Sequence, residues 1–138
     1  MAWETLAEAK LHRGKRTGWI YALLDPSTGI ARYVGKTIDP LRREEDHCTL
    51  GSQPGNPKLE NWKSELVSAG LAPEMVIIGM VSASNEYLFH AMIDDAEKAA
   101  IRQMNRSQRL EGKPLLFNIA TVIPQRKIKK SLPKIHSM

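Results

Sequence analysis

The alternation of apolar and polar residues predicts a β-hairpin near the start of the chain. Two apolar runs, at 19–24 and 30–35, are separated by residues 25–29, whose sequence DPSTG is typical of a tight turn. Short apolar runs on either side of turn residues favour two antiparallel strands. The first run contains Tyr21 and the second contains Tyr33, so we expect the two tyrosines on neighbouring strands.

Two helices are predicted after the hairpin. Asp39 suits the N-cap and Pro40 the first position of a helix that we expect to run to about Thr49. The stretch 51–57, rich in Gly, Pro and Ser, predicts a loop. A second helix is predicted by apolar residues at helical spacing and is ended by Gly70. These apolar residues are Leu59, Trp62, Leu66 and Val67.

A strand and a long helix are predicted in the second half of the chain. The nearly continuous apolar run 75–81 favours a buried strand. Ser84 or Asn85 is a suitable N-cap for a helix that reaches about Met104.

The remaining segments complete an α+β pattern. Residues 105–114 predict a polar loop, after which the apolar segment 115–117 returns to the core and is followed by Asn118. Residues 2–12 predict a short N-terminal helix. A small antiparallel sheet covered by helices would bury the apolar faces of all these elements.

Bulk composition is that of a globular protein of modest size. With 138 residues, 42% hydrophobic and 25% charged, we expect one domain. No apolar run approaches the ~20 residues that cross a bilayer, and the start of the chain lacks the apolar core of a secretion signal. The single cysteine, Cys48, excludes an internal disulfide and a cysteine-based zinc site. We therefore expect a cytoplasmic protein without a membrane partner.

The net charge of +5 is unevenly distributed. Residues 125–138 contain five basic residues and no acid, and residues 10–16 contain four more, whereas 17–124 has 11 basic and 13 acidic residues. Such basic ends could bind phosphates, or they could be solubilising segments, and the charge alone does not decide between the two. The basic residues of the last stretch are Arg126, Lys127, Lys129, Lys130 and Lys134.

Arg43 and His47 are the first candidates for chemistry. They lie four residues apart on one predicted helix and therefore share a face. Because this helix directly follows the strand that carries Tyr33, its first turn should lie near both tyrosines. The alternative is that residues 42–47 form an ordinary charged, solvated helix surface.

Glu97 is a candidate because of its position on the long helix. It lies on an apolar stripe together with Ile93, Ile101 and Met104. A carboxylate in such a stripe is costly to bury unless it is paired or binds a metal. The alternative to a metal is an ion pair at the margin of the stripe, with Arg102 or Arg43 as the partner.

Asn118 is a weaker candidate, since an amide at the end of an apolar segment often only satisfies backbone groups. It could instead orient a catalytic side chain or a phosphate. Other signals are absent from the sequence: the four histidines lack metal-ligand spacing, and there is no phosphate-binding loop or nucleophile elbow.

Taken together and in order, Tyr21, Tyr33, Arg43, His47, Glu97 and Asn118 resemble the active-site set of the GIY-YIG nuclease superfamily. The resemblance covers about residues 18–120. The matching stretches are Gly18-Trp19-Ile20-Tyr21, Arg32-Tyr33-Val34-Gly35-Lys36-Thr37 and Asp39-Pro40-Leu41-Arg42-Arg43. One departure is Trp19, which stands where the family has the first glycine of its opening triplet, with Gly18 one place earlier.

The resemblance implies a small three-stranded antiparallel sheet flanked by helices and an activity, the metal-dependent hydrolysis of DNA phosphodiester bonds. It divides the chain into an N-terminal helix and basic linker at 1–17, a nuclease domain at 18–120 and a basic tail at 121–138. The substrate would be duplex or branched DNA, with a protein partner as a possible source of specificity.

The resemblance also implies roles for individual residues. Glu97 would bind a single divalent ion, Mg²⁺ or in its place Mn²⁺, which suits a site with one carboxylate and several waters. Arg43 would bind the scissile phosphate. Tyr21 would activate the attacking water, with Tyr33 positioning it or sharing that role. His47 would support Tyr21 or a phosphate by hydrogen bonding.

The remaining implied contacts are with the substrate. Asn118 would hold a phosphate or a catalytic side chain. An unperturbed tyrosine has a pKa of ~10, so nearby positive charge would have to favour the phenolate. Residues expected to contact the DNA are Gly35, Lys36, Arg42, Lys127, Lys129 and Lys130.

Two other function classes stay open. The same fold could serve as a non-catalytic nucleic-acid-binding module that uses the basic tail. It could also serve as a protein-interaction domain in which the tail binds an acidic partner.

Overall fold

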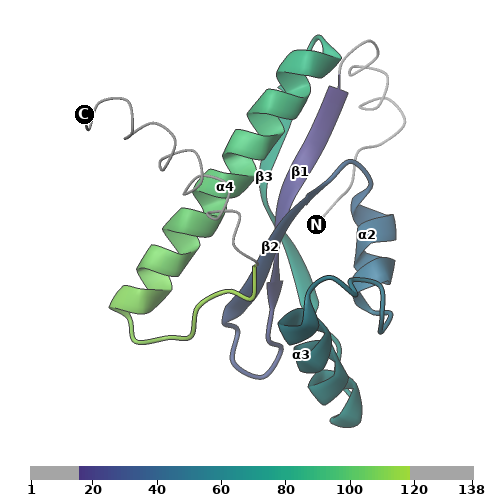
Figure 1. The fold of residues 1–138 in the computed structure, drawn as a ribbon, viewed down its shortest axis with the longest axis vertical. Helices are drawn as coiled ribbons and strands as arrows, with labels where there is room; N and C mark the ends of the chain where they lie inside the picture. Colours follow the sequence, from purple (N-terminus) through teal and green to yellow (C-terminus); the bar gives the residue numbers. More distant parts are fainter. Residues whose placement is uncertain (1–15, 119–138) are drawn as a thin grey trace, which may run out of the picture.

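The computed structural model describes residues 16–118, which form an α+β fold with one three-stranded antiparallel sheet and helices on both of its faces (Figure 1). The elements are β1 (Arg16–Leu24), β2 (Ala31–Thr37), α2 (Pro40–His47), α3 (Pro57–Ser68), β3 (Glu74–Ala83) and α4 (Glu86–Leu110). This confirms the predicted fold class. The helix predicted at 2–12 and the basic tail lie outside the described residues. Within 16–118 no helix has the length and apolar character needed to span a membrane.

The predicted hairpin is present as β1 and β2, with β1 beginning three residues earlier than its apolar run. The turn is closed by a hydrogen bond from the Gly29 amide to the Asp25 carbonyl, 2.7 Å long. The Asp25 carboxylate also accepts a bond from the Ser27 amide at 2.8 Å. Gly29 has a φ of 72°, a left-handed conformation that glycine adopts at little cost.

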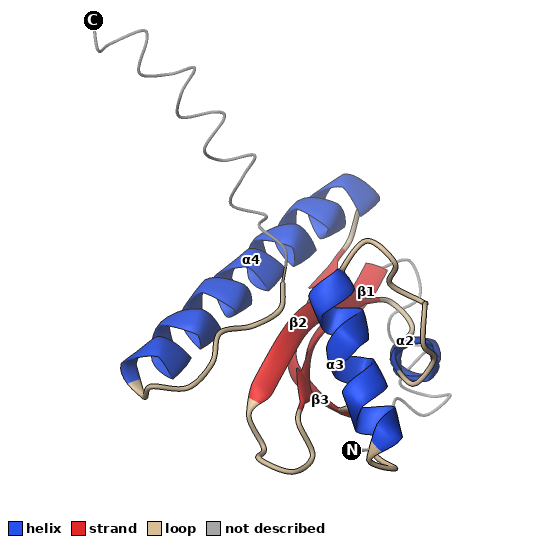
Figure 2. Cartoon of the chain, turned by 60° about the horizontal axis from the view of Figure 1, so that its bottom comes forward, coloured by secondary structure: helices blue, strands red, loops and turns tan. Residues whose placement is uncertain are grey.

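The strand order β2-β1-β3 makes β1 the central strand, and its two faces enter two different cores. Ile20 and Ala22 pack in a cluster with residues of α4, whereas Tyr21 and Leu23 pack in a cluster with residues of α3. Figures 1 and 2 show α4 on one side of the sheet and α2 with α3 on the other. A strand buried on both faces explains why residues 19–24 form an uninterrupted apolar run.

The prediction of a buried strand at 75–81 is only half correct. The strand exists as β3, but it lies at the edge of the sheet, with Ile78 42% and Met80 59% exposed. In the pairing with β1, Ile20 lies opposite Gly79 and Tyr21 opposite Ile77, so Ile78 is the extra residue of a bulge. An apolar run does not reveal whether its strand is paired on one side or on two.

The caps confirm the predicted starts of α2 and α4. The Asp39 carboxylate accepts a hydrogen bond from the Arg42 amide at 3.2 Å, although α2 ends at His47 rather than Thr49. Asn56 caps α3 in the same way. Asn85, rather than Ser84, caps α4 through a 2.7 Å bond from the Leu88 amide.

The predicted end of the long helix is wrong, because α4 continues six residues beyond Met104. The polar residues that suggested a loop make tertiary hydrogen bonds instead. Gln108 is buried and donates to the carbonyls of Ala31 and Pro114, at 3.1 and 2.7 Å. The Asn105 side chain accepts a bond from the Leu116 amide at 2.8 Å. These bonds hold the returning segment against the helix.

At Gly18 the backbone of β1 lies close to side chains of α4. A Cβ at this position would stand 2.5 Å from Ile93 Cδ1 and 2.9 Å from Phe89 Cζ, both in the buried core. A Cβ at Gly79 would meet nothing nearer than 3.6 Å.

We therefore expect Gly18→Ala to destabilise the protein by about 1–3 kcal/mol, because the extra methyl overpacks the core. Gly79→Ala, the matched control on the neighbouring strand, should change stability by less than about 0.5 kcal/mol. Chemical denaturation of both variants tests this, and equal stabilities would show that α4 does not approach β1 this closely.

Candidate active site

The β1–β2 register places the two tyrosines side by side. Tyr21 lies opposite Gly35, and Tyr33 lies opposite Leu23, on the face of the sheet that α3 covers. The ring centroids are 6.3 Å apart. Tyr21 is only 2% exposed, while Tyr33 is half-buried. The expectation of neighbouring tyrosines on one hairpin is confirmed.

Gly35 is required by the position of the Tyr21 ring. A Cβ on Gly35 would stand 2.5 Å from Tyr21 Cζ and closer still to the phenolic oxygen. The glycine therefore lets the phenol lie directly against the backbone of β2, a close approach that a side chain would prevent. Its role is to make room for Tyr21, which is separate from the DNA contact predicted for it.

His47, the last residue of α2, forms a hydrogen bond with Tyr21. Its Nε2 lies 2.7 Å from Tyr21 Oη, and its ring centroid lies 5.4 Å from that of Tyr21 and 5.6 Å from that of Tyr33. The three rings form one cluster drawn from β1, β2 and α2. The predicted hydrogen-bond partners of His47 were Tyr21 and a phosphate, and in the structure the partner is Tyr21.

The protonation of His47 follows from its surroundings. Burial, with the positive charges of Lys63 and Arg43, lowers the pKa of His47 to about 4, although Asp46 and Glu60 act in the opposite direction. The imidazole is therefore neutral at pH 7. Its buried Nδ1 has no hydrogen-bond partner among residues 16–118. This favours the tautomer that carries the proton on Nε2 and donates it to Tyr21, because a buried N–H without an acceptor is costly.

Both tyrosines are protonated at neutral pH in the protein alone. Burial raises the pKa of Tyr21 far above its usual value, and the charges of Tyr33 and Glu97 raise it further. Burial and then Glu97 also raise the pKa of Tyr33. The Arg43 guanidinium lowers the pKa of both phenols, but it does not outweigh burial.

Arg43 lies on α2 at the margin of this cluster. Its side chain is 38% exposed, and its nearest carboxylate is that of Asp46, with an Nη1–Oδ2 distance of 3.7 Å. It is thus a cation that solvent can reach and whose field acts on both buried phenols. The neighbouring Arg42 is exposed, and its backbone amide serves the helix cap.

Glu97 lies on α4, which packs against the opposite face of the sheet, and its side chain is 18% exposed. The ammonium of Lys36 on β2 lies 3.8 Å from Glu97 Oε1 and also pairs with Asp94. The ion-pair partner is therefore Lys36, and neither Arg102 nor Arg43. Burial raises the pKa of Glu97, an effect that Lys36 partly offsets and Asp94 reinforces.

The predicted residues thus form two groups around β2. Tyr21, Tyr33 and His47 touch one another on one face, with Arg43 beside them, and Lys36 pairs with Glu97 on the other. The field of Glu97 reaches both tyrosines, as their pKa shifts show, while no hydrogen bond joins it to either phenol within the described chain.

The carboxylates near Glu97 suit only a metal ion that keeps most of its bound waters. Within residues 16–118 no three acidic, histidine or cysteine side chains gather closely enough to enclose a metal. Glu97 and Asp94 are three residues apart on α4 and converge on one cation, the Lys36 ammonium. Mg²⁺ commonly binds through one or two carboxylates and keeps several waters, so these residues fit it.

Asn118 is occupied by the backbone of β2. Its Oδ1 accepts a bond from the Val34 amide at 2.9 Å, and its Nδ2 donates to the Val34 carbonyl at 2.6 Å. The side chain therefore pairs with the edge of β2 as a neighbouring strand would, midway between Tyr33 and Gly35. Asn118 therefore satisfies backbone groups, which is the first of the two roles considered for it.

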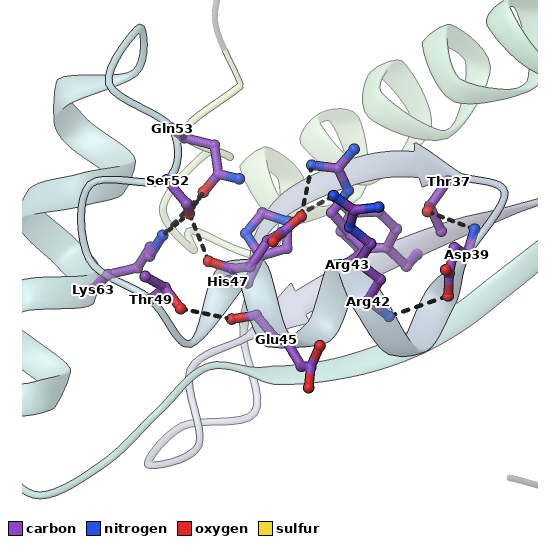
Figure 3. A network of polar contacts seen from close by, with 12 residues as sticks. Thr37, Asp39, Arg42, Arg43, Glu45, His47, Thr49, Ser52, Gln53 and Lys63 are labelled. Atoms are coloured by element: carbon purple, nitrogen blue, oxygen red, sulfur yellow. Dashed lines mark hydrogen bonds and ion pairs between the residues drawn. The ribbon is translucent and has the colours of Figure 1, made fainter.

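Lys63, which the sequence analysis missed, fixes the loop after His47. Its side chain is 1% exposed, and its ammonium donates to Ser52 Oγ, Gln53 Oε1 and Glu60 Oε2 at 2.9–3.1 Å. Figure 3 shows this network beside His47. The signal was present in the sequence, because Lys63 interrupts the apolar stripe of α3 much as Glu97 interrupts that of α4.

Other parts of the chain do not add to this site. Lys127, Lys129 and Lys130 lie outside the described residues. An apolar pocket of about 500 Å³ lies between β3 and α4, on the α4 face of the sheet, and none of its lining side chains is titratable. It does not coincide with the tyrosine cluster.

Comparisons of the chain with protein-family models, with curated proteins and with solved structures find no significant match.

We expect Gly35→Ala to displace the Tyr21 ring and to break its bond with His47, with a loss of about 1–3 kcal/mol of stability. Gly55→Ala is the control, because a Cβ there meets no atom within 4 Å. Chemical denaturation measures the loss, and NMR of the His47 ring reports the bond. An unchanged His47 spectrum in Gly35→Ala would contradict the close approach.

Acid should destabilise the protein through His47. Its pKa of about 4 in the folded state lies below the ~6.5 of an unfolded chain, so folding excludes the charged imidazole. This contribution, about 3 kcal/mol, is present above pH 6.5 and is lost as the pH falls through 4. Unfolding measured from pH 7 to pH 4 should show a weaker pH dependence in His47→Gln. Equal slopes in the wild type and in His47→Gln would refute the assignment.

Proposed function

We propose that the protein is a metal-dependent endonuclease that hydrolyses DNA phosphodiester bonds. The observation that carries this proposal is the buried cluster of Tyr21, Tyr33 and His47, which is influenced by the charges of Arg43 and Glu97 from two different helices. A buried tyrosine needs one hydrogen-bond partner, but it does not need the charges of a cation and of a half-buried carboxylate across the sheet, both of which act on the two phenols here. These are the residues on which the resemblance to GIY-YIG nucleases rests.

Arg43 would bind the scissile phosphate. Its guanidinium is accessible to solvent, and its weak contact with Asp46, at 3.7 Å, leaves most of its donors available to a substrate. Arginine forms bidentate, charge-assisted hydrogen bonds with phosphate oxygens. Negative charge that develops on the phosphate during hydrolysis would be stabilised by the same contact.

Tyr21 would accept a proton from the attacking water. It can do so only as the phenolate, and a hydrogen bond donated by His47 Nε2 stabilises that form. Burial opposes it, so the pKa of Tyr21 must fall when substrate and cations assemble at the site. Tyr33, which is more exposed, would orient the water.

Glu97, with Asp94, would hold the divalent ion. The ion would supply positive charge that offsets the charge developing on the phosphate. Lys36 now pairs with both carboxylates, and with a divalent ion held there it would be free to contact the phosphate. Asn118 would act indirectly, by fixing the backbone between Tyr33 and Gly35.

A second candidate is a non-catalytic module that binds nucleic acid. It is favoured by the raised pKa of both tyrosines and by the pairing of Lys36 with Glu97, because protonated phenols and a paired carboxylate provide no free base. This candidate predicts DNA binding without any need for metal, and without cleavage.

With Mg²⁺ and supercoiled plasmid, we expect the wild type to nick DNA and both Glu97→Ala and Arg43→Ala to lose about 10²-fold or more in rate. Asp95→Ala, an exposed carboxylate two residues from Glu97 on the same helix, should retain wild-type activity. Gel separation of nicked from supercoiled plasmid measures the rates.

Failure of the wild type to cut duplex, branched and single-stranded DNA would reject the nuclease proposal. Undiminished cutting by Glu97→Ala and Arg43→Ala would retain the activity but refute these residues as its site.

A further inference from the structure

Four basic residues form a ridge along the second half of α4. Lys98, Arg102, Arg106 and Arg109, called the basic ridge below, follow one another at intervals of four, four and three residues. At 100° per residue they fall within an arc of about 80° on the helix surface. The three arginines are exposed and Lys98 is half-buried, so the ridge faces solvent.

The basic ridge begins beside the carboxylates of the candidate site. Lys98 directly follows Glu97, and Asp94 lies about 40° from it around the helix. The pocket residues Ala99 and Gln103 lie on the other flank, toward β3. The ridge therefore leads toward the C-terminal end of α4 on the side of the helix opposite its core-packing residues, and so it faces away from the sheet.

The stability of the helix does not explain these charges. No carboxylate of residues 16–118 lies within ion-pair distance of any of the four. Only Arg109 is in the last turn, where a cation favours the helix dipole. Like charges three or four residues apart destabilise a helix by roughly 0.2–0.5 kcal/mol per pair, so the ridge carries a cost.

The chemistry of the ridge matches a nucleic-acid backbone. The rise along α4 from Lys98 to Arg109 is about 16 Å, which is the axial length of roughly five phosphates on one strand of a duplex. Arginine dominates, and it is the side chain best shaped to bind phosphate. No apolar side chain lies within the arc, so the ridge lacks the apolar centre of a protein interface.

We propose that the basic ridge binds the phosphate backbone of DNA and guides one strand along α4, away from the candidate site. The inference rests on the proposed function only in taking DNA as the partner. Summed over residues 17–124 the charge is slightly acidic, and only the helical arrangement shows that these four cations are gathered on one side.

The test measures DNA binding in the presence of EDTA, so that cleavage plays no part. A fluorescein-labelled duplex is titrated with the full chain, and anisotropy gives the affinity at several salt concentrations. Arg102→Gln/Arg106→Gln is compared with Lys58→Gln, a control that removes an exposed charge on α3. Circular dichroism verifies that both variants are folded.

We expect the ridge variant to weaken binding by on the order of tenfold or more and to reduce the salt slope by about 2, because two phosphate contacts are lost. The control should change both quantities much less. Equal effects in the two variants would show that the ridge binds DNA no better than any other surface charge, which would overturn the proposal. Absence of DNA binding by the wild type would also overturn it.

Two further outcomes separate this proposal from others. Binding of polyglutamate in preference to DNA would assign the ridge to an acidic protein and overturn it. If the wild type binds DNA through the ridge but never cuts it, the nuclease proposal is rejected and the ridge proposal stands. If the ridge variant nicks plasmid normally and binds DNA as the wild type does, the ridge proposal is rejected and the nuclease proposal stands.

Discussion

The hydrogen bond between Tyr21 and His47 is the contact on which the arrangement of the candidate site depends. Tyr21 belongs to the central strand and is buried, so its hydroxyl must find a partner inside the protein. The phenol reaches His47 only because Gly35 leaves space above β2. His47 in turn is held by the Asp39 cap at one end of α2 and by the Lys63 network at the other. The Tyr21 hydroxyl thus links β1 to α2 and requires a glycine on β2.

The same burial sets a conflict between stability and the proposed chemistry. Burial keeps both phenols protonated and His47 neutral, and these uncharged forms cost the least free energy to bury. Catalysis by Tyr21 needs the charged form. Within the described residues Arg43 supplies part of the required positive charge, whereas the charge of Lys36 is taken up by its pairing with Glu97 and Asp94. Activity would therefore depend on cations that arrive with the substrate.

The sequence predicted best what local chemistry determines. The DPSTG turn and the caps at Asp39 and Asn85 act on backbone groups within a few residues, so they could be assigned without a fold. The exposure of β3 depends on which strands flank it. The extra length of α4 depends on partners of Asn105 and Gln108 that are distant in sequence.

The candidate site, too, could be predicted from the sequence only where local periodicity determines it. The position of Glu97 in an apolar stripe correctly indicated a half-buried carboxylate, because the stripe follows from helical periodicity alone. Its partner Lys36 lies 61 residues earlier, and only the sheet brings the two together. The two uses considered for Asn118 could not be separated until both of its amide groups were seen on Val34.

The departure at Trp19 is a real difference from the GIY-YIG pattern and cannot be explained as a shift by one residue. Successive residues of β1 face opposite sides of the sheet, so Gly18 faces α4, where Ile93 and Phe89 leave no room for a Cβ. Trp19 shares a face with Tyr21 and is buried. A glycine at 18 therefore serves the packing of α4 and cannot replace one at 19. The position of the Tyr21 phenol is set by Gly35 and His47. The proposed function therefore requires only that the site accept the bulky side chain of Trp19, two residues before Tyr21.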